Sequence, residues 1–407
     1  MPLAPRLLVA DQVAGSVTVL DLPDGRVTGV VAGRHLAEHA GFLALPGGRW
    51  AFVDDLAGEL VVLDPYGPDA GRPLVPVTVP VAVPAEHLAA DPSGRHLAVT
   101  TGLGRNEAAW TDLLTVIDLG AAAGPRSVRV RTRAGEPGVT LPAGPGGPLV
   151  VLRHREPGSL TAYRYADLMA AGPACPPATP SWETPLPDHD AHGDAHDPLT
   201  GRLFAAAGSG VHRARRHGDR LVAEEPLPWA GPGRGYYLRL DPVRRTLWSC
   251  VRGGPADPAR WPGWTNDAWY HVLDTGRTGR VPLGPGLVFR LAVGRRHVAY
   301  ARVHPDGDEL VLLDAAAPRV TARRPLPPMD GAPRPGATPW DGVQRRAVAA
   351  SPGADLTAVT RGGHGEVHVF DGAEPLATLS LPTPLDDGGH LALTSPEDGA
   401  WADPVGR

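Results

Sequence analysis

The sequence is poor in several features, and each shortage excludes a class of protein. Its two cysteines, Cys175 and Cys250, are too few for a disulfide framework or a cysteine-based zinc site. No stretch of about 18 apolar residues could span a bilayer. The N-terminus lacks a charged segment followed by a long apolar run, so no signal peptide is visible. We therefore expect a soluble cytoplasmic protein without a membrane span, exported only if a leader has been removed.

Lysine is absent, because all 39 basic residues are arginine, and Ile117 is the single isoleucine. Together with 51 glycines and 47 prolines, this bias indicates a GC-rich bacterial genome and lowers the weight of any one Arg or Pro. The net charge of -5 gives no general attraction to nucleic acid or to an anionic membrane surface. Neither is therefore an expected partner.

A repeat fills most of the chain: an alternating apolar strand that ends in Asp, then a turn and another strand. Clear copies are SVTVLDLPDGRVTGVV from 16, ELVVLDPYGPDAG from 59, LLTVIDLGAAAG from 113, WYHVLDTGRTGRVPL from 269, ELVLLDAAAPRV from 309 and EVHVFDGAEPLATL from 366. Degenerate copies are SLTAYRYADL from 159 and GVHRARRHGDRL from 210. Each repeat also carries an earlier strand pair, as in HLAADPSGRHLAVTT, residues 87–101. Four short strands in every 40 to 60 residues are typical of a β-propeller.

These repeats resemble the YVTN-type bacterial propellers, whose units read strand, P-x-G turn, strand and V-x-V-x-D. The resemblance covers nearly the whole chain and implies the fold. We predict an all-β chain that forms a single β-propeller domain over residues 1–407, with eight blades. Seven is the alternative, if residues 138–228 hold one blade with a long insertion. The segment GGHLALTSPEDG, residues 388–399, should supply the innermost strand of the blade formed by residues 6–33 and so remove open sheet edges.

Candidate ligand-binding residues follow from this architecture. In a propeller, the connections into the innermost strands and the loops between second and third strands emerge on one face, called here the upper face, around the central channel. The candidates on that face are Arg153, His154, Arg234, Tyr236, His390, Trp261 and Trp264. The two tryptophans belong to its longest loop, a Trp-rich insertion at 252–269, which would form a rim or lid. The alternatives are that the tryptophans pack the insertion onto the blades and that the histidines cap strand ends.

The stretch PDHDAHGDAHDP, residues 187–198, concentrates three histidines and four aspartates between Asp188 and Asp197. If residues 191–197 are extended, then His192, Asp194 and His196 share one side of the strand. Imidazole and carboxylate suit zinc or another late first-row divalent metal. One strand rarely supplies a whole shell, so His87 and His39 would complete it from neighbouring blades. The alternative is a hydrated loop whose aspartates make turns and cap backbone amides.

A second resemblance bears on this stretch. The segments GVTLPAGPGGPLVVLRHREPGSLTAYRY (138–165) and DAHGDAHDPLTGRLFAAAGSGV (190–211) resemble the middle blades of periplasmic zinc metallochaperone propellers. The resemblance implies that His192-Gly193-Asp194-Ala195 stands where that family has His-Gly-Glu-Ala at its central zinc site. The sequence departs from the family at Glu136-Pro137-Gly138, which replaces His-His-Gly, and in lacking the family's cysteines.

Three functions are open at this point. The first is a binding protein with a divalent, zinc-like metal or a small-molecule ligand at the upper mouth of the channel. The second is an enzyme of lyase, lactonase or isomerase type that uses His and Arg acid-base chemistry on an anionic small molecule, with its catalytic residues unassigned. The third is a scaffold that contacts a protein partner through the upper-face loops. The sequence contains no nucleophile elbow, phosphate loop or dinucleotide fingerprint, and the fold does not decide among these functions.

Overall fold

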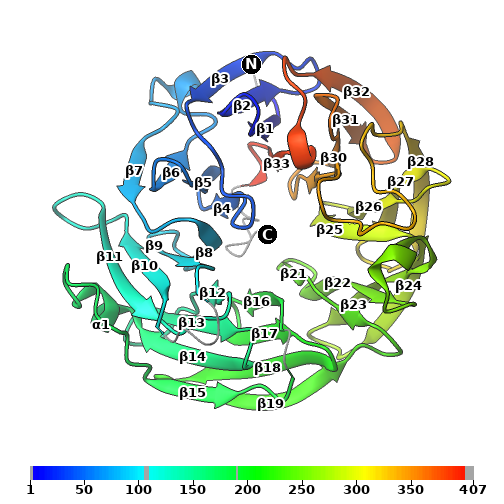
Figure 1. Ribbon diagram of the computed structural model, residues 1–407. Helices are drawn as coiled ribbons and strands as arrows, with labels where there is room; N and C mark the ends of the chain where they lie inside the picture. The colour runs from blue at the N-terminus through cyan, green and yellow to red at the C-terminus, as the bar shows by residue number, and fades with distance from the viewer. Residues whose placement is uncertain (1–2, 105–109, 189–190, 399–407) are drawn as a thin grey trace. The chain divides into compact units, whose positions relative to one another are not determined.

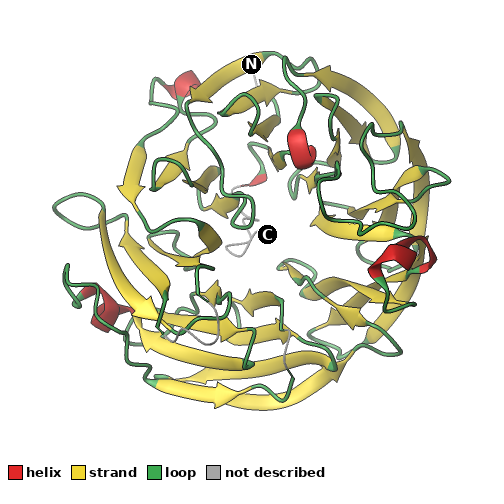
Figure 2. Cartoon of the chain, in the orientation of Figure 1, coloured by secondary structure: helices red, strands yellow, loops and turns green. Residues whose placement is uncertain are grey.

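The computed structural model describes residues 3–104, 110–188 and 191–398. Its regular structure is almost entirely β-strand (Figure 2). The helical elements within these residues are short: α1 (Tyr165–Met169), η1 (Pro68–Ala70), η2 (Pro258–Gly263) and η3 (Asp386–Gly388). No helix in the described part of the chain is long and apolar enough to cross a membrane.

The chain divides into two compact units, labelled by strand in Figure 1. Unit 2 comprises the described residues of 36–229 and 234–240, and it holds four antiparallel sheets whose strands are neighbours in chain order. The first two sheets are β4 (Leu43–Leu45), β5 (Arg49–Asp54), β6 (Glu59–Leu63) and β7 (Val77–Pro80), then β8 (Ala85–Ala90), β9 (His96–Thr101), β10 (Asp112–Asp118) and β11 (Arg126–Thr132). The next two are β12 (Gly138–Thr140), β13 (Leu149–His154), β14 (Ser159–Arg164) and β15 (Trp182–Pro185), then β16 (Gly193–Asp197), β17 (Arg202–Ala206), β18 (Gly210–His217) and β19 (Arg220–Pro228).

Unit 1 comprises the described residues of 3–35, 230–233 and 241–398. One sheet has the order β3 (Val27–Ala32), β2 (Ser16–Asp21), β1 (Arg6–Asp11) and β33 (His390–Thr394). Two more are β25 (Leu287–Val293), β26 (His297–Val303), β27 (Asp308–Asp314) and β28 (Val320–Leu326), then β29 (Val348–Ala350), β30 (Leu356–Arg361), β31 (Glu366–Asp371) and β32 (Glu374–Ser380). The last contains β22 (Thr246–Gly253), β23 (Thr265–Val272) and β24 (Thr278–Pro285), with the short β20 (Arg234–Gly235) and β21 (Arg239–Asp241) assigned to the same sheet.

These eight sheets are the eight blades of a β-propeller, which confirms the predicted fold class. The degenerate region 138–228 forms two complete blades, β12–β15 and β16–β19, so the seven-blade alternative is excluded. The Trp-rich insertion predicted at residues 252–269 is shorter than expected, because β22 continues to Gly253 and β23 begins at Thr265. The connection between these two strands is residues 254–264.

Aspartates at strand ends stabilise the hairpins of the repeat. The Asp54 carboxylate accepts hydrogen bonds from the N–H groups of Leu56 and Ala57, at 3.0 and 3.1 Å. Asp11 and Asp314 make the same pair of bonds with the residues two and three positions further along the chain. An Asp side chain that bonds its own turn replaces backbone pairing that the turn residues cannot make. Of these three, Asp314 is an Asp of the sequence repeat, whereas Asp11 and Asp54 end the strand that precedes the repeated one.

The C-terminal strand completes the first blade, as the sequence predicts. β33 pairs antiparallel with β1, in a register that runs from Arg6 opposite Thr394 to Ala10 opposite His390. Leu393 lies in an apolar core that also contains Leu7 and Val9. The free edge of β1 is thereby covered by a strand from the far end of the chain, which protects it from edge-to-edge association.

Replacing Leu393 by Ala should lower the free energy of unfolding by about 2–5 kcal/mol, because it leaves a cavity where β33 packs on β1. The matched control is Leu376→Ala on the outer strand β32, where the side chain is 42% exposed and the expected change is within about 0.5 kcal/mol. Urea unfolding followed by far-UV circular dichroism measures both. Equal stability of the two variants would contradict the packing role of β33.

Candidate functional site

The His/Asp-rich stretch forms an inner strand of unit 2, as predicted. β16 is extended, and the His192 N–H donates to the Ala206 carbonyl at 3.0 Å, which continues the ladder with β17. Asp194 and His196 are two positions apart on this strand, so their side chains leave it on the same side. His189 and Asp190 lie outside the described residues.

Gly193 allows a second segment to pass close to this strand. A Cβ atom at this position would lie 2.6 Å from the Tyr236 carbonyl oxygen and 2.9 Å from the Tyr237 Cα. The two tyrosines consequently lie beside His192, and their rings meet the imidazole edge-on at centroid distances of 6.0 and 5.7 Å. The Arg234 Nε donates to the Tyr236 hydroxyl at 2.5 Å, and its guanidinium lies 4.5 Å above the same ring. This places three of the predicted residues together.

Arg153 on β13 connects these elements. Its side chain is buried, with 3% of the residue exposed. One terminal nitrogen donates to the Ala191 carbonyl, and the other donates to the His192 carbonyl at 3.1 Å and lies 3.4 Å from the His87 Nε2. The Nε lies 3.5 Å from an Asp194 carboxylate oxygen. A single guanidinium therefore holds β8, β13 and the start of β16 in one arrangement.

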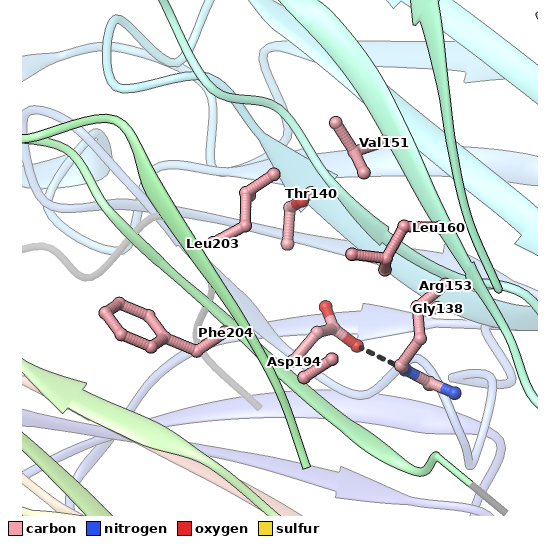
Figure 3. Close-up of a pocket in the computed structure, with 9 residues that line it drawn as sticks. Gly138, Thr140, Val151, Arg153, Leu160, Asp194, Leu203 and Phe204 are labelled. Atoms are coloured by element: carbon pink, nitrogen blue, oxygen red, sulfur yellow. Dashed lines mark ion pairs between the residues drawn. The ribbon is translucent and has the colours of Figure 1, made fainter. Parts of the chain in front are cut away.

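Figure 3 shows the Arg153–Asp194 ion pair beside a small cavity between β12–β14 and β16–β17. The cavity offers about 10 Å³ to the centre of a water-sized molecule. The remaining lining is mostly apolar: Gly138, Thr140, Val151, Leu160, Leu203, Phe204 and Ala205. Burial raises the pKa of the Asp194 carboxyl, and Arg153 offsets part of that rise. The space suits one water molecule and is too small for an organic ligand.

Two features next to Arg153 were missed by the sequence analysis. A Cβ atom at Gly138 would lie 2.4 Å from the guanidinium and 2.5 Å from the Asp194 carboxylate, so glycine is needed for the ion pair to form. Glu136 has a φ of +47°, unusual for a residue with a side chain, and accepts a hydrogen bond from Arg155 at 2.6 Å. The available signal was the Glu-Pro-Gly sequence itself, whose glycine suggests a close approach.

Three histidines of unit 2 are neutral at physiological pH. Burial, and then the positive charges of Arg153 and Arg155, lowers the pKa of His192 to about 4. Burial also lowers the pKa of His196 to about 4 and that of His154 to about 3. The Nε2 of His196 is buried and has no hydrogen-bond partner among the described residues.

His154, a predicted ligand-binding residue, is completely buried, and its Nε2 lies 3.2 Å from the Thr161 Oγ1. It therefore contributes to packing within the blade of β12–β15 and presents no surface to a ligand in this conformation.

The described geometry does not gather the predicted metal ligands into one shell. Among the residues that the structure describes, no three or more His, Cys, Asp or Glu side chains are arranged to hold a metal ion. The Asp194 carboxylate and the His87 Nε2 both face Arg153, whose positive charge opposes a cation there. His39 is 68% exposed and lies instead 3.4 Å from the Glu86 carboxylate. A divalent metal does not fit these residues as they are arranged.

The remaining predicted residues belong to unit 1. Trp261 and Trp264 are 0% and 3% exposed, and their indole N–H groups donate to the carbonyls of Arg334 and Pro255. They form an apolar core with Leu287, Val303 and Met329, so the tryptophans pack the insertion against β25 and β26 of the next blade. His390 begins β33, and its Nδ1 lies 3.2 Å from Arg290. Contact between either indole and a ligand would require this insertion to open.

Comparisons with known proteins support the fold. No family model and no curated protein matches the sequence. Among solved structures, apo AztD from Citrobacter koseri has a TM-score of 0.66 at 12% identity, covering 96% of this chain and 98% of that one. Another AztD structure from C. koseri has 0.65 at 13%, covering 96% and 97%. The dihydro-heme d1 dehydrogenase NirN in complex with DHE has 0.59 at 14%, covering 94% and 75%. At these identities the likeness concerns the fold alone.

Replacing Arg153 by Leu should lower the free energy of unfolding by about 3–5 kcal/mol, because it leaves the buried Asp194 carboxylate without its partner. The double variant Arg153→Leu/Asp194→Leu should be less destabilised, since it buries no unpaired charge. Chemical denaturation of both variants measures the difference. A double variant as unstable as the single one would show that the unpaired Asp194 carboxylate does not cause the loss of stability.

The stability of the protein should fall as the pH is lowered from about 6.5 towards about 4. The folded-state pKa values of His154, His192 and His196 lie below the unfolded value, so in this range the unfolded chain takes up protons that the folded chain does not. Urea unfolding at about pH 7.5, 6 and 5 measures the slope. The slope should be smaller for His154→Gln and unchanged for His217→Gln, which replaces an exposed histidine of β18. A slope unaffected by His154→Gln would contradict this assignment.

Proposed function

We propose that the protein is a ligand-binding β-propeller whose site is the cluster formed by His87, Arg153, His192, Tyr236 and Tyr237 in unit 2, called here the Arg153 cluster. The observation that carries the proposal is the buried guanidinium, which bonds the backbone at the start of β16 and contacts His87. The His87 ring and the backbone that carries His192 are thereby held in place before any ligand arrives. Such preorganisation lowers the entropic cost of binding.

The chemistry of the cluster favours a small organic molecule. The tyrosine rings offer flat apolar surface, and their hydroxyls, like the imidazoles, offer hydrogen bonds. Binding is better supported than acid-base catalysis, because a general acid or base works best with a pKa near the working pH, whereas that of His192 is about 4. A chain with the same fold, NirN, has been solved in complex with DHE, which supports the capacity of this architecture to hold a ligand.

Zinc binding is the second candidate. The observation that favours it is the neutral imidazole of His192, since a metal binds the deprotonated ring nitrogen. It would use the predicted ligands His192, Asp194 and His196, with His87 and His39. Arg153 stands against it, because the guanidinium occupies the Asp194 carboxylate and lies against His87. Zinc coordination would require this arrangement to change.

A thermal-shift panel tests the proposed function. Zinc chloride, sodium benzoate and benzyl alcohol represent a metal, an organic anion and a neutral aromatic, and a ligand that binds the folded state raises its Tm. At least one probe should raise the Tm of wild type and of the control His217→Ala. The same probe should raise the Tm of His192→Ala less. Failure of all three probes, or an equal response from His192→Ala, would contradict a binding site at the Arg153 cluster.

A further inference from the structure

The blade that the two ends of the chain form together has an uncovered outer strand. β3 is the outermost strand of its sheet, whose order is β3-β2-β1-β33 (Figure 1). It pairs with β2, and the Thr28 hydroxyl donates to the Val19 carbonyl at 3.3 Å. No other hydrogen bond joins β3 to the described part of the chain. In an antiparallel pair, alternate residues direct their N–H and C=O groups away from the partner, so one side of the β3 backbone faces solvent.

β3 differs in composition from every other outer strand that the structure describes. Its sequence, VTGVVA, contains neither a charged residue nor a proline. Each of the others contains at least one of the two: β7 (VTVP), β11 (RSVRVRT), β15 (WETP), β19 (RLVAEEPLP), β24 (TGRVPLGP), β28 (VTARRPL) and β32 (EPLATLS). Charges and prolines on an outer strand prevent edge-to-edge pairing. This protection is therefore present on every described outer edge except that of β3.

The side chains of β3 also leave its edge open to contact. Val27 and Val30 are each 54% exposed. The nearest charged residues lie outside the strand, where Arg26 is paired with Asp21 and Arg34 follows the last residue. A bulge can also protect an edge, but the register irregularity between β2 and β3 lies near the start of β3 and the rest of the ladder is regular. Most of the strand can therefore accept a further strand.

We propose that β3 pairs antiparallel with β3 of a second copy of this chain, across a two-fold axis, and so joins the two sheets into one. A two-fold contact brings the same surface of both copies together, so a charged residue near the centre of the strand would face its own like charge. β3 contains no such residue, and its exposed valines come to lie in the contact, where apolar surface is removed from water. A strand without charged side chains has nothing with which to select a charged partner. The proposal is independent of the Arg153 cluster.

The length of the strand sets the strength of this contact. The six residues of β3 span about 20 Å when extended, so only a few backbone hydrogen bonds can form between the copies. Stable, specific interfaces usually bury at least about 1,200 Å², and one pair of short strands lies at the low end of the size range. We therefore expect a weak dimer whose population rises with the concentration of the protein.

Sedimentation velocity measures the association. The weight-average sedimentation coefficient of wild type should rise between about 5 and 500 μM protein. Val30→Lys should raise the dissociation constant of the dimer at least about fivefold, because each copy then brings a positive charge into the contact. The matched control is Val222→Lys on β19, where the valine is 55% exposed on an outer strand that already contains charged residues. The control should associate like wild type, and thermal unfolding confirms that each variant is folded.

Hydrogen exchange locates the contact. The amides of residues 27–32 in wild type should exchange more slowly at about 500 μM than at about 5 μM protein, and those of Val30→Lys should change less. A wild type that stays monomeric over this range would overturn the proposal. Association that Val30→Lys and Val222→Lys weaken equally, or protection that appears only in other strands, would overturn it too. None of these results bears on ligand binding at the Arg153 cluster.

Discussion

The buried guanidinium of Arg153 is the constraint on which the arrangement of this site depends. A charge that leaves water must be paired and hydrogen-bonded, because an isolated buried ion is very costly. Arg153 meets that requirement with the Asp194 carboxylate, the Ala191 and His192 carbonyls and the His87 ring. His87 belongs to β8, and the other partners belong to β16 or to the connection before it. The inner strands β8, β13 and β16 are therefore held in one relative position, and Gly138 is small because it lies against this ion pair.

The same constraint decides the chemistry of residues that would otherwise suit a metal. Asp194 alone is a good metal ligand, but next to Arg153 it is one half of an ion pair. His87 alone could use either nitrogen, but the guanidinium selects its tautomer. The imidazole of His192 stays neutral because it is buried and two arginines lie near it. A cluster that by composition favours zinc is consequently arranged around an ion pair, and its described residues do not form a metal shell.

Arg153 and His192 of the candidate site lie in the two blades whose repeats are most degenerate, or in the connection that enters one of them. The repeated Asp is replaced by Arg164 in one and Arg215 in the other, and both repeats form complete four-stranded sheets nevertheless. Local departures from a repeat often occur where residues serve a purpose other than folding. In unit 1 the tryptophans that depart from the repeat serve folding. Trp261 and Trp264 depart from the repeat too, but they are buried and fold their own insertion.

The sequence by itself determined the all-β class, the strand-end aspartates and the pairing of β33 with β1, and it favoured eight blades over seven. All of these depend on a period of two along each strand and on turn residues, which are local properties repeated many times. It also predicted that, if residues 191–197 are extended, His192, Asp194 and His196 share one side. In the structure the strand is Gly193–Asp197, and Asp194 and His196 lie on one side of it. The tertiary structure alone decided what those side chains face. Arg153, Gly138 and His87 are far from Asp194 in the sequence, and no local pattern shows that a buried guanidinium will come between them. The chemistry of a site depends on all the charges that the fold brings together. The sequence of a single strand does not show which charges the other strands contribute.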